Sequence, residues 1–131
     1  MTAARPRRPQ SRPARTKLRK LHGWDFLTPI DEVMRGLDDV VRAGKVLYVG
    51  VSDTAAWIIS YAHALAEPRG WSAFVGVQAE YSLARRVAER DLLPMARSLG
   101  LGLLASSPLC NGLLTGKYMG PSPDAARTPA S

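Results

Sequence analysis

The stretch Gly-Lys-Val-Leu-Tyr-Val-Gly-Val-Ser-Asp, residues 44–53, decides the fold of this chain. Within it, residues 46–51 are apolar or glycine and do not alternate with polar residues, which predicts a strand buried on both faces. The run ends on Ser52 and Asp53. Ligands of parallel α/β proteins bind just beyond the carboxyl ends of such strands, so these two side chains are the first candidates for a site.

Three further short strands are predicted at residues 18–22, 74–79 and 101–105, and each gives way to a polar loop. The polar residues at the four strand ends lie 30, 26 and 28 residues apart, and they are His22, Ser52, Gln78 and Ser106. A strand, a crossover helix and the return need about 30 residues, so the spacing predicts βα units and a parallel sheet. The four polar side chains should then gather on one rim.

The predicted fold class is therefore α/β, with about four βα units. A complete (β/α)₈ TIM barrel has eight such units in about 250 residues, so the pattern corresponds to a partial barrel. A flavodoxin-like doubly wound sheet of four strands is the alternative. The glycine-rich phosphate fingerprint that such a sheet carries after its first strand is absent from this sequence.

Helices are predicted between the strands from apolar spacing and from end signals. Thr28 is the predicted N-cap of the first helix, whose apolar stripe runs from residue 30 to residue 41, and Gly44 stops it. Asp53 or Thr54 is the predicted cap of the second helix. Its apolar face is predicted to consist of Trp57, Ile58, Tyr61, Ala62 and Leu65. A third helix is predicted over residues 92–99, with Pro94 in or near its first turn.

Composition limits the class of protein. The chain has 131 residues, of which 46% are hydrophobic, which suits one domain with a core. The net charge of +7 comes from residues 1–20, which hold eight of the 18 basic residues and no acidic one. The lone Cys110 excludes an internal disulfide and fits a reducing, cytoplasmic location. No spacing of metal ligands and no apolar run of about 20 residues occurs, so neither a metal nor a membrane is expected.

The two ends of the sequence differ from the middle. Residues 1–17 form a basic arm rich in arginine and proline and are predicted to be disordered, as are residues 119–131. Residues 18–118 are predicted to form the folded part. The arm could contact nucleic-acid phosphates, but no aromatic residue interleaves its charges, so a solvated tail is the favoured interpretation.

Four blocks of this sequence lie between residues 21 and 118, and they are Leu21-His22-Gly23-Trp24-Asp25, residues 44–52, residues 77–83 and residues 107–118. The four blocks resemble the aldo-keto reductases, in particular the branch with bacterial reductases and the potassium-channel β subunits. The blocks occur in that family's order and at its spacing. The resemblance implies an NADPH-dependent reductase of small aldehydes and ketones, built as a (β/α)₈ barrel with the nicotinamide over the carboxyl ends of the strands.

The resemblance also implies roles for single residues. His22 would be the catalytic-site histidine that orients and polarises the substrate carbonyl. Ser52 and Gln78 would bind the nicotinamide carboxamide, beside Asp53, where the family usually has asparagine. The ribose and pyrophosphate of the cofactor would be lined by Ser106, Ser107, Leu109 and Lys117.

In the family a tyrosine, tuned by a lysine and an aspartate, donates the proton, and all three precede the histidine block. Residues 1–20 contain no tyrosine and no aspartate. The expectation is therefore an internal fragment, a truncated form with little or no activity alone. Two other functions remain open: an interaction module that self-associates through exposed sheet edges, and nucleic-acid contact through the basic arm.

Overall fold

The computed structural model describes residues 16–117. The predictions for residues 1–15 and 118–131 lie outside the described residues. The first strand begins at Thr16, so the folded part starts before the predicted boundary at residue 18, and residues 16 and 17 belong to it.

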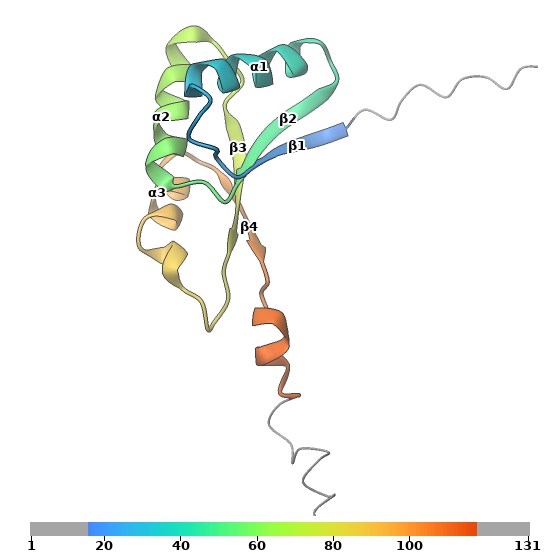
Figure 1. Cartoon of the computed structure of the whole chain (residues 1–131), viewed down its shortest axis with the longest axis vertical. Helices are drawn as coiled ribbons and strands as arrows, with labels where there is room; N and C mark the ends of the chain where they lie inside the picture. The colour runs from blue at the N-terminus through green and yellow to red at the C-terminus, as the bar shows by residue number, and fades with distance from the viewer. Residues whose placement is uncertain (1–15, 118–131) are drawn as a thin grey trace, which may run out of the picture.

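Four parallel strands alternate with helices (Figure 1). The strands are β1 (Thr16–His22), β2 (Val46–Ser52), β3 (Phe74–Glu80) and β4 (Gly102–Ser106). The α-helices are α1 (Ile30–Arg42), α2 (Ala56–Ala66) and α3 (Leu92–Ser98). Three short 3₁₀ helices complete the chain, and they are η1 (Glu67–Arg69), η2 (Val87–Glu89) and η3 (Cys110–Thr115).

The strand order in the sheet is β1-β2-β3-β4, the order of the sequence, and every neighbouring pair is parallel. The three α-helices cover one face of the sheet, and α1 contacts α2, which contacts α3 (Figure 1). A doubly wound sheet reverses direction at a switch point and carries helices on both faces. Sequential order with helices on one face is instead the arrangement of a (β/α)₈ barrel, so the predicted α/β partial barrel is confirmed.

Helix α1 packs by the predicted stripe. Met34 is fully buried, and further apolar residues of the helix pack against the core, namely Ile30, Leu37, Val40 and Val41. Gly44 has φ of 68° and donates its N–H to the Val41 carbonyl, which ends the helix as predicted. The predicted cap is wrong: the N-cap is Pro29, and the Thr28 hydroxyl donates to Asp25 instead. The proline occupies this position because its missing N–H costs nothing there.

Strand β2 is buried except at its second and third residues. Val49, Val51 and Ser52 are almost fully buried, whereas Leu47 and Tyr48 are 42% and 56% exposed. The prediction of a strand buried on both faces is therefore wrong at Leu47 and Tyr48 and confirmed at the other positions. Successive side chains point to opposite faces, and no helix covers the second face in the described part of the chain, which leaves Tyr48 open to solvent.

Helix α2 buries Ile58 and Ala62 as predicted, but its buried face is rotated away from the predicted Trp57 and Tyr61. Its core residues are Ala56, Ile58, Ile59, Ala62 and Ala66. Trp57 and Tyr61 are 65% and 51% exposed. The helix is apolar at nearly every position, so spacing alone does not select a face. The small alanine side chains allow the helix to approach the sheet closely, and this determines which face of the helix is buried. No side chain caps this helix: Ala55 is the N-cap, and Thr54 donates to the Ser52 carbonyl.

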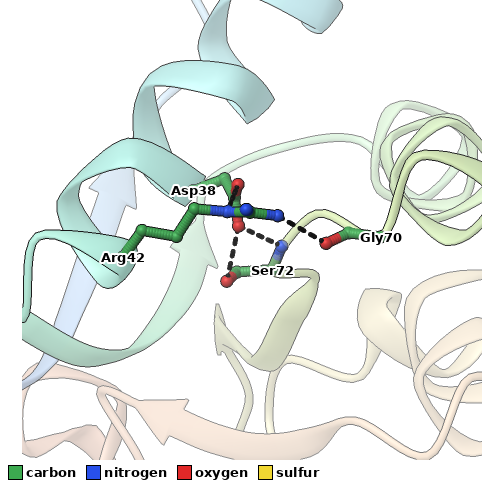
Figure 2. A network of polar contacts seen from close by, with 4 residues as sticks. All are labelled: Asp38, Arg42, Gly70 and Ser72. Carbon is green, nitrogen blue, oxygen red and sulfur yellow. Dashed lines mark hydrogen bonds and ion pairs between the residues drawn. The ribbon is translucent and has the colours of Figure 1, made fainter.

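A buried carboxylate ties α1 to the loop that precedes β3 (Figure 2). Asp38 Oδ1 accepts from the Ser72 N–H at 2.8 Å and from the Ser72 hydroxyl at 2.9 Å, while Asp38 Oδ2 pairs with Arg42. The Arg42 guanidinium also donates to the Gly70 carbonyl at 3.2 Å. Burial alone would raise the pKa of Asp38, but the Ser72 bonds and the Arg42 charge together hold it below 3.8.

Among residues 16–117, no helix has the length and apolarity needed to cross a bilayer. The same residues contain no cluster of three or more histidine, cysteine, aspartate or glutamate side chains that could hold a metal ion.

Candidate functional site

Three of the predicted site residues form one row across the sheet. His22 is the register partner of Ser52, and Ser52 is the register partner of Gln78. Partners in neighbouring parallel strands project from the same face. The adjacent residues Val51 and Val77 are buried in the core beneath the helices, so the row projects from the opposite face, which no helix covers among residues 16–117. On this open face His22 is exposed and Gln78 is partly exposed, whereas Ser52 is only 1% exposed.

Asp53 joins two members of the row. Its Oδ2 accepts from the Ser52 hydroxyl at 3.2 Å and lies 3.4 Å from His22 Nδ1. The Asp53 backbone has φ of 48°, a conformation that aspartate tolerates better than most residues. The loop after β1 is held at the same place, because the Gly23 N–H donates to the Ser52 carbonyl at 3.0 Å. His22 also lines a shallow pocket of about 290 Å³ with Trp24.

One polar residue of the open face was not predicted from the sequence. Lys20 donates a hydrogen bond from its ammonium group to Gln78 Oε1. It precedes His22 by two residues in β1, and the period of two along a strand places both side chains on one face. This alternation is the sequence signal that predicts Lys20 on the same face as His22.

Ser106 lies at the same end of the sheet but further along. Leu104 is the register partner of Gln78, and Ser106 pairs with Glu80. The Ser106 carbonyl accepts from the Tyr81 N–H at 3.2 Å. The similar spacing of the four residues in sequence therefore does not place Ser106 at the level of the other three, because β3 extends past Gln78 to Glu80 before it ends.

The other predicted cofactor residues belong to the segment after β4. Ser107 and Leu109 precede η3 and Lys117 follows it, beyond the end of the strand (Figure 1). Gly112 has φ of 91°, and a Cβ there would lie 2.9 Å from Lys117 Nζ. The lysine thus folds back over the glycine. The structure brings His22, Ser52, Asp53 and Gln78 together and places this second group on a separate segment.

The loop after β3 carries its own polar cluster. The Tyr81 hydroxyl donates to Glu89 at 2.6 Å, and Arg86 pairs with the same carboxylate at 2.8 Å and 3.0 Å. The hydrogen bond to Glu89 raises the pKa of Tyr81, and the bonds from Arg86 and Tyr81 lower that of Glu89. These contacts fix the conformation of the loop that follows β3.

Comparison with known protein families decides the classification of this fold and row. The model of the aldo/keto reductase family matches residues 12–130. The chain belongs to the aldo/keto reductase family.

Relatives agree with the family. An uncharacterized oxidoreductase, YrpG, of Bacillus subtilis (strain 168) is 46% identical over 103 residues, which is 79% of this chain and 32% of that protein. The norsolorinic acid reductase of Aspergillus flavus is 42% identical over 115 residues, 82% of this chain and 30% of the relative. An aryl-alcohol dehydrogenase [NADP(+)] of Phanerodontia chrysosporium is 42% identical over 92 residues, 70% of this chain and 24% of the relative.

The chain thus spans between about a quarter and a third of the length of these curated relatives. Membership of this family classifies the sequence as that of an oxidoreductase of the aldo/keto reductase type. Enzymes of this family use nicotinamide cofactors.

The row fits the nicotinamide end of such a cofactor in its chemistry. A carboxamide offers a carbonyl oxygen that accepts hydrogen bonds and an N–H₂ group that donates them. Gln78 and Ser52 can donate, and Asp53 and Ser52 can accept. The glycines beside the row, Gly50 and Gly76, leave the sheet surface flat, since an added Cβ on either would lie within about 3 Å of a backbone oxygen.

Proposed function

We propose that this chain forms the nicotinamide-binding part of an NADPH-dependent reductase of aldehydes and ketones. The observation that carries the proposal is the alignment of His22, Ser52 and Gln78 at one level on the open face of a parallel sheet. Active sites of such barrels are built at the carboxyl ends of the strands, where these residues stand.

Ser52 and Gln78 would bind the carboxamide and so fix which face of the nicotinamide ring meets the substrate. The cofactor supplies the hydride when it is bound. The backbone of Ser52 is fixed, because its carbonyl accepts from the Thr54 hydroxyl and from the Gly23 N–H. A held backbone limits the ways in which the hydroxyl can turn.

Asp53 stands where the family usually has asparagine, and it would change how the carboxamide is recognised. A carboxylate accepts but does not donate, so it can meet only the amide N–H of the carboxamide. It also lies against His22, whose ring it would hold in place beside the substrate carbonyl. The proposal therefore gives Asp53 a double role, at the cofactor and behind the histidine.

Ser106, Ser107, Leu109 and Lys117 would extend the site along the ribose and pyrophosphate. The lysine would supply the positive charge that phosphate needs. Because Lys117 folds over Gly112, its position depends on the loop rather than on the sheet.

The proposal assigns binding and orientation to this chain and leaves Tyr81 outside the chemistry. Tyr81 follows the row in sequence, but its hydroxyl already donates to Glu89, and that bond raises its pKa. A raised pKa makes a weaker proton donor. We also infer the first substrates to test: an aryl aldehyde with NADPH, because one relative is named an aryl-alcohol dehydrogenase [NADP(+)].

Titration of the purified protein with NADPH, followed by quenching of tryptophan fluorescence, tests the proposal. We expect saturable binding that Ser52→Ala and Gln78→Ala each weaken by about threefold to tenfold, the usual worth of one hydrogen bond. Ser98→Ala is the matched control, since Ser98 is exposed on α3. Equal binding by all three variants, or no saturable binding, would contradict the assignment.

A further inference from the structure

The hydrogen bond from Lys20 to Gln78 crosses a whole strand. Lys20 is on β1, its register partner Gly50 is on β2, and Gln78 is on β3. The side chain must therefore lie over β2 to reach Oε1. Neighbouring strands are about 4.8 Å apart, so the lysine stem spans close to its full length.

Gly50 makes this path available. A Cβ at Gly50 would lie 3.5 Å from Lys20 Cγ and 3.1 Å from the Gly76 carbonyl oxygen. Any larger side chain would occupy the space that the lysine stem fills. The glycine and the lysine therefore act together, and the stem covers the part of the sheet that the glycine leaves bare.

The contact determines the direction in which the Gln78 amide points. An ammonium group has three donors and no acceptor, so only the amide oxygen can face it. The amide N–H₂ is then left as the part of Gln78 available to a ligand. Without the lysine, the amide could rotate by half a turn and exchange its donor and acceptor ends.

We propose that Lys20 is a positioning residue of the cofactor site, which holds Gln78 as a hydrogen-bond donor toward the nicotinamide carboxamide. This inference rests on the proposed function for the role of Gln78, but the contact itself stands on the free protein. Asp53 next to the row is an acceptor. Together the two residues offer one donor and one acceptor, which matches a carboxamide in a single orientation.

The first experiment uses the protein without cofactor. The side-chain N–H₂ signals of Gln78 are assigned by NMR in the unmodified protein and in three variants, Lys20→Met, Lys20→Arg and Arg19→Met. Methionine keeps the length of the stem without the ammonium, and Arg19 is an exposed cation on the adjacent position of the same strand. We expect the signals to move in Lys20→Met only, with Lys20→Arg close to the unmodified protein. Unchanged Gln78 signals in Lys20→Met would overturn the proposal.

The second experiment measures NADPH affinity in the same variants and in Gln78→Ala. We expect Lys20→Met to weaken binding by about threefold to tenfold, Lys20→Arg to restore most of it, and Arg19→Met to leave it unchanged. In the double variant Lys20→Met/Gln78→Ala, binding should be no weaker than in Gln78→Ala alone. Additive losses would show that the lysine acts independently of Gln78 and would overturn the proposal. If the unmodified protein binds no NADPH, the proposed function fails, and the NMR signals still decide whether Lys20 positions Gln78.

Discussion

Removing the Asp38 carboxylate should destabilise the protein, because this side chain links helix α1 to the loop before β3. Two of its three hydrogen bonds join the helix to Ser72, the third is made with Arg42 of the same helix, and the residue is only 4% exposed (Figure 2). Asp38→Ala removes Oδ1, the acceptor that the Ser72 N–H and hydroxyl share. The Ser72 N–H is then left in a partly buried loop without its partner.

The ion pair with Arg42 and the hydrogen bonds from Ser72 contribute unequally to the stability that Asp38 provides. Arg42 has a side chain that is 64% exposed, so water replaces most of its ion pair, which is worth about 0.5 to 1 kcal/mol. The bonds from Ser72 to a buried charged acceptor are worth more, about 2 kcal/mol together after the cost of burying the carboxylate. We expect Asp38→Ala to lower the free energy of unfolding by about 3 kcal/mol. Asp38→Asn keeps an oxygen for Ser72 and should lose about 1 kcal/mol.

Urea unfolding followed by circular dichroism measures these changes. At a slope of about 1 to 1.5 kcal/mol per molar urea, Asp38→Ala should lower the midpoint by about 2 to 3 M. Asp39→Asn is the control, because Asp39 is exposed on the same helix, and it should stay within about 0.5 kcal/mol of the unmodified protein. An Asp38→Ala midpoint equal to that of the control would refute the reasoning.

The same carboxylate makes a pH prediction with a definite sign. The pKa of Asp38 in the folded protein lies below its value of 3.8 in a free side chain. The unfolded chain therefore takes up the proton first as the pH falls. The stability that ionised Asp38 contributes is complete above 3.8 and is lost as the pH falls through the lower, folded-state pKa. The difference between Asp38→Asn and the unmodified protein should shrink over that window.

Three further predictions follow from single contacts. Gly50→Ala should destabilise the protein by about 1 to 3 kcal/mol, because its Cβ would lie 3.1 Å from a backbone oxygen, whereas Gly36→Ala, with nothing within 4 Å in α1, should stabilise it by about 0.5 to 1 kcal/mol. Thermal melts of both variants measure this, and equal shifts of one sign would count against it. Burial lowers the pKa of His63 below 6.5, and its Nε2 has no partner among the described residues, so stability should fall as the pH drops below 6.5. His63→Leu should remove this pH dependence, and melts that still fall equally in the variant would disprove the cause. Asp91→Ala should cost about 1 kcal/mol, because Asp91 caps α3 by accepting from the Leu92 N–H, and an unchanged urea midpoint would contradict that role.

Sequence reasoning worked best where local rules act alone. The stripe of α1, its stop at Gly44 and the strand ends at His22 and Ser52 depend on spacing and on glycine conformation, and all four are as predicted. The family resemblance of residues 21–118 is confirmed by the family match. The roles of the site residues and the disorder of the two ends stay predictions.

Packing between elements was the part that the sequence did not determine. The buried face of α2 was predicted only in part because nearly every position of that helix is apolar. Ile58 and Ala62 are buried as predicted, but Ala56, Ile59 and Ala66 are buried in place of Trp57 and Tyr61. The open face of β2 depends on which elements cover it, and no local pattern carries that information. The contact of Lys20 was not predicted, because a lone lysine in a strand is usually solvated and its partner Gln78 lies 58 residues away in sequence.

The most direct test of the central claim is a map of where NADPH binds. Backbone N–H signals of the isotope-labelled protein, followed by NMR during titration with NADPH, report on every described residue except proline. The account predicts that the largest shifts occur at His22, Ser52, Asp53 and Gln78, at the level where β1 and β2 end. Shifts spread over the outer surfaces of α1 and α2, or no shifts at all, would contradict it.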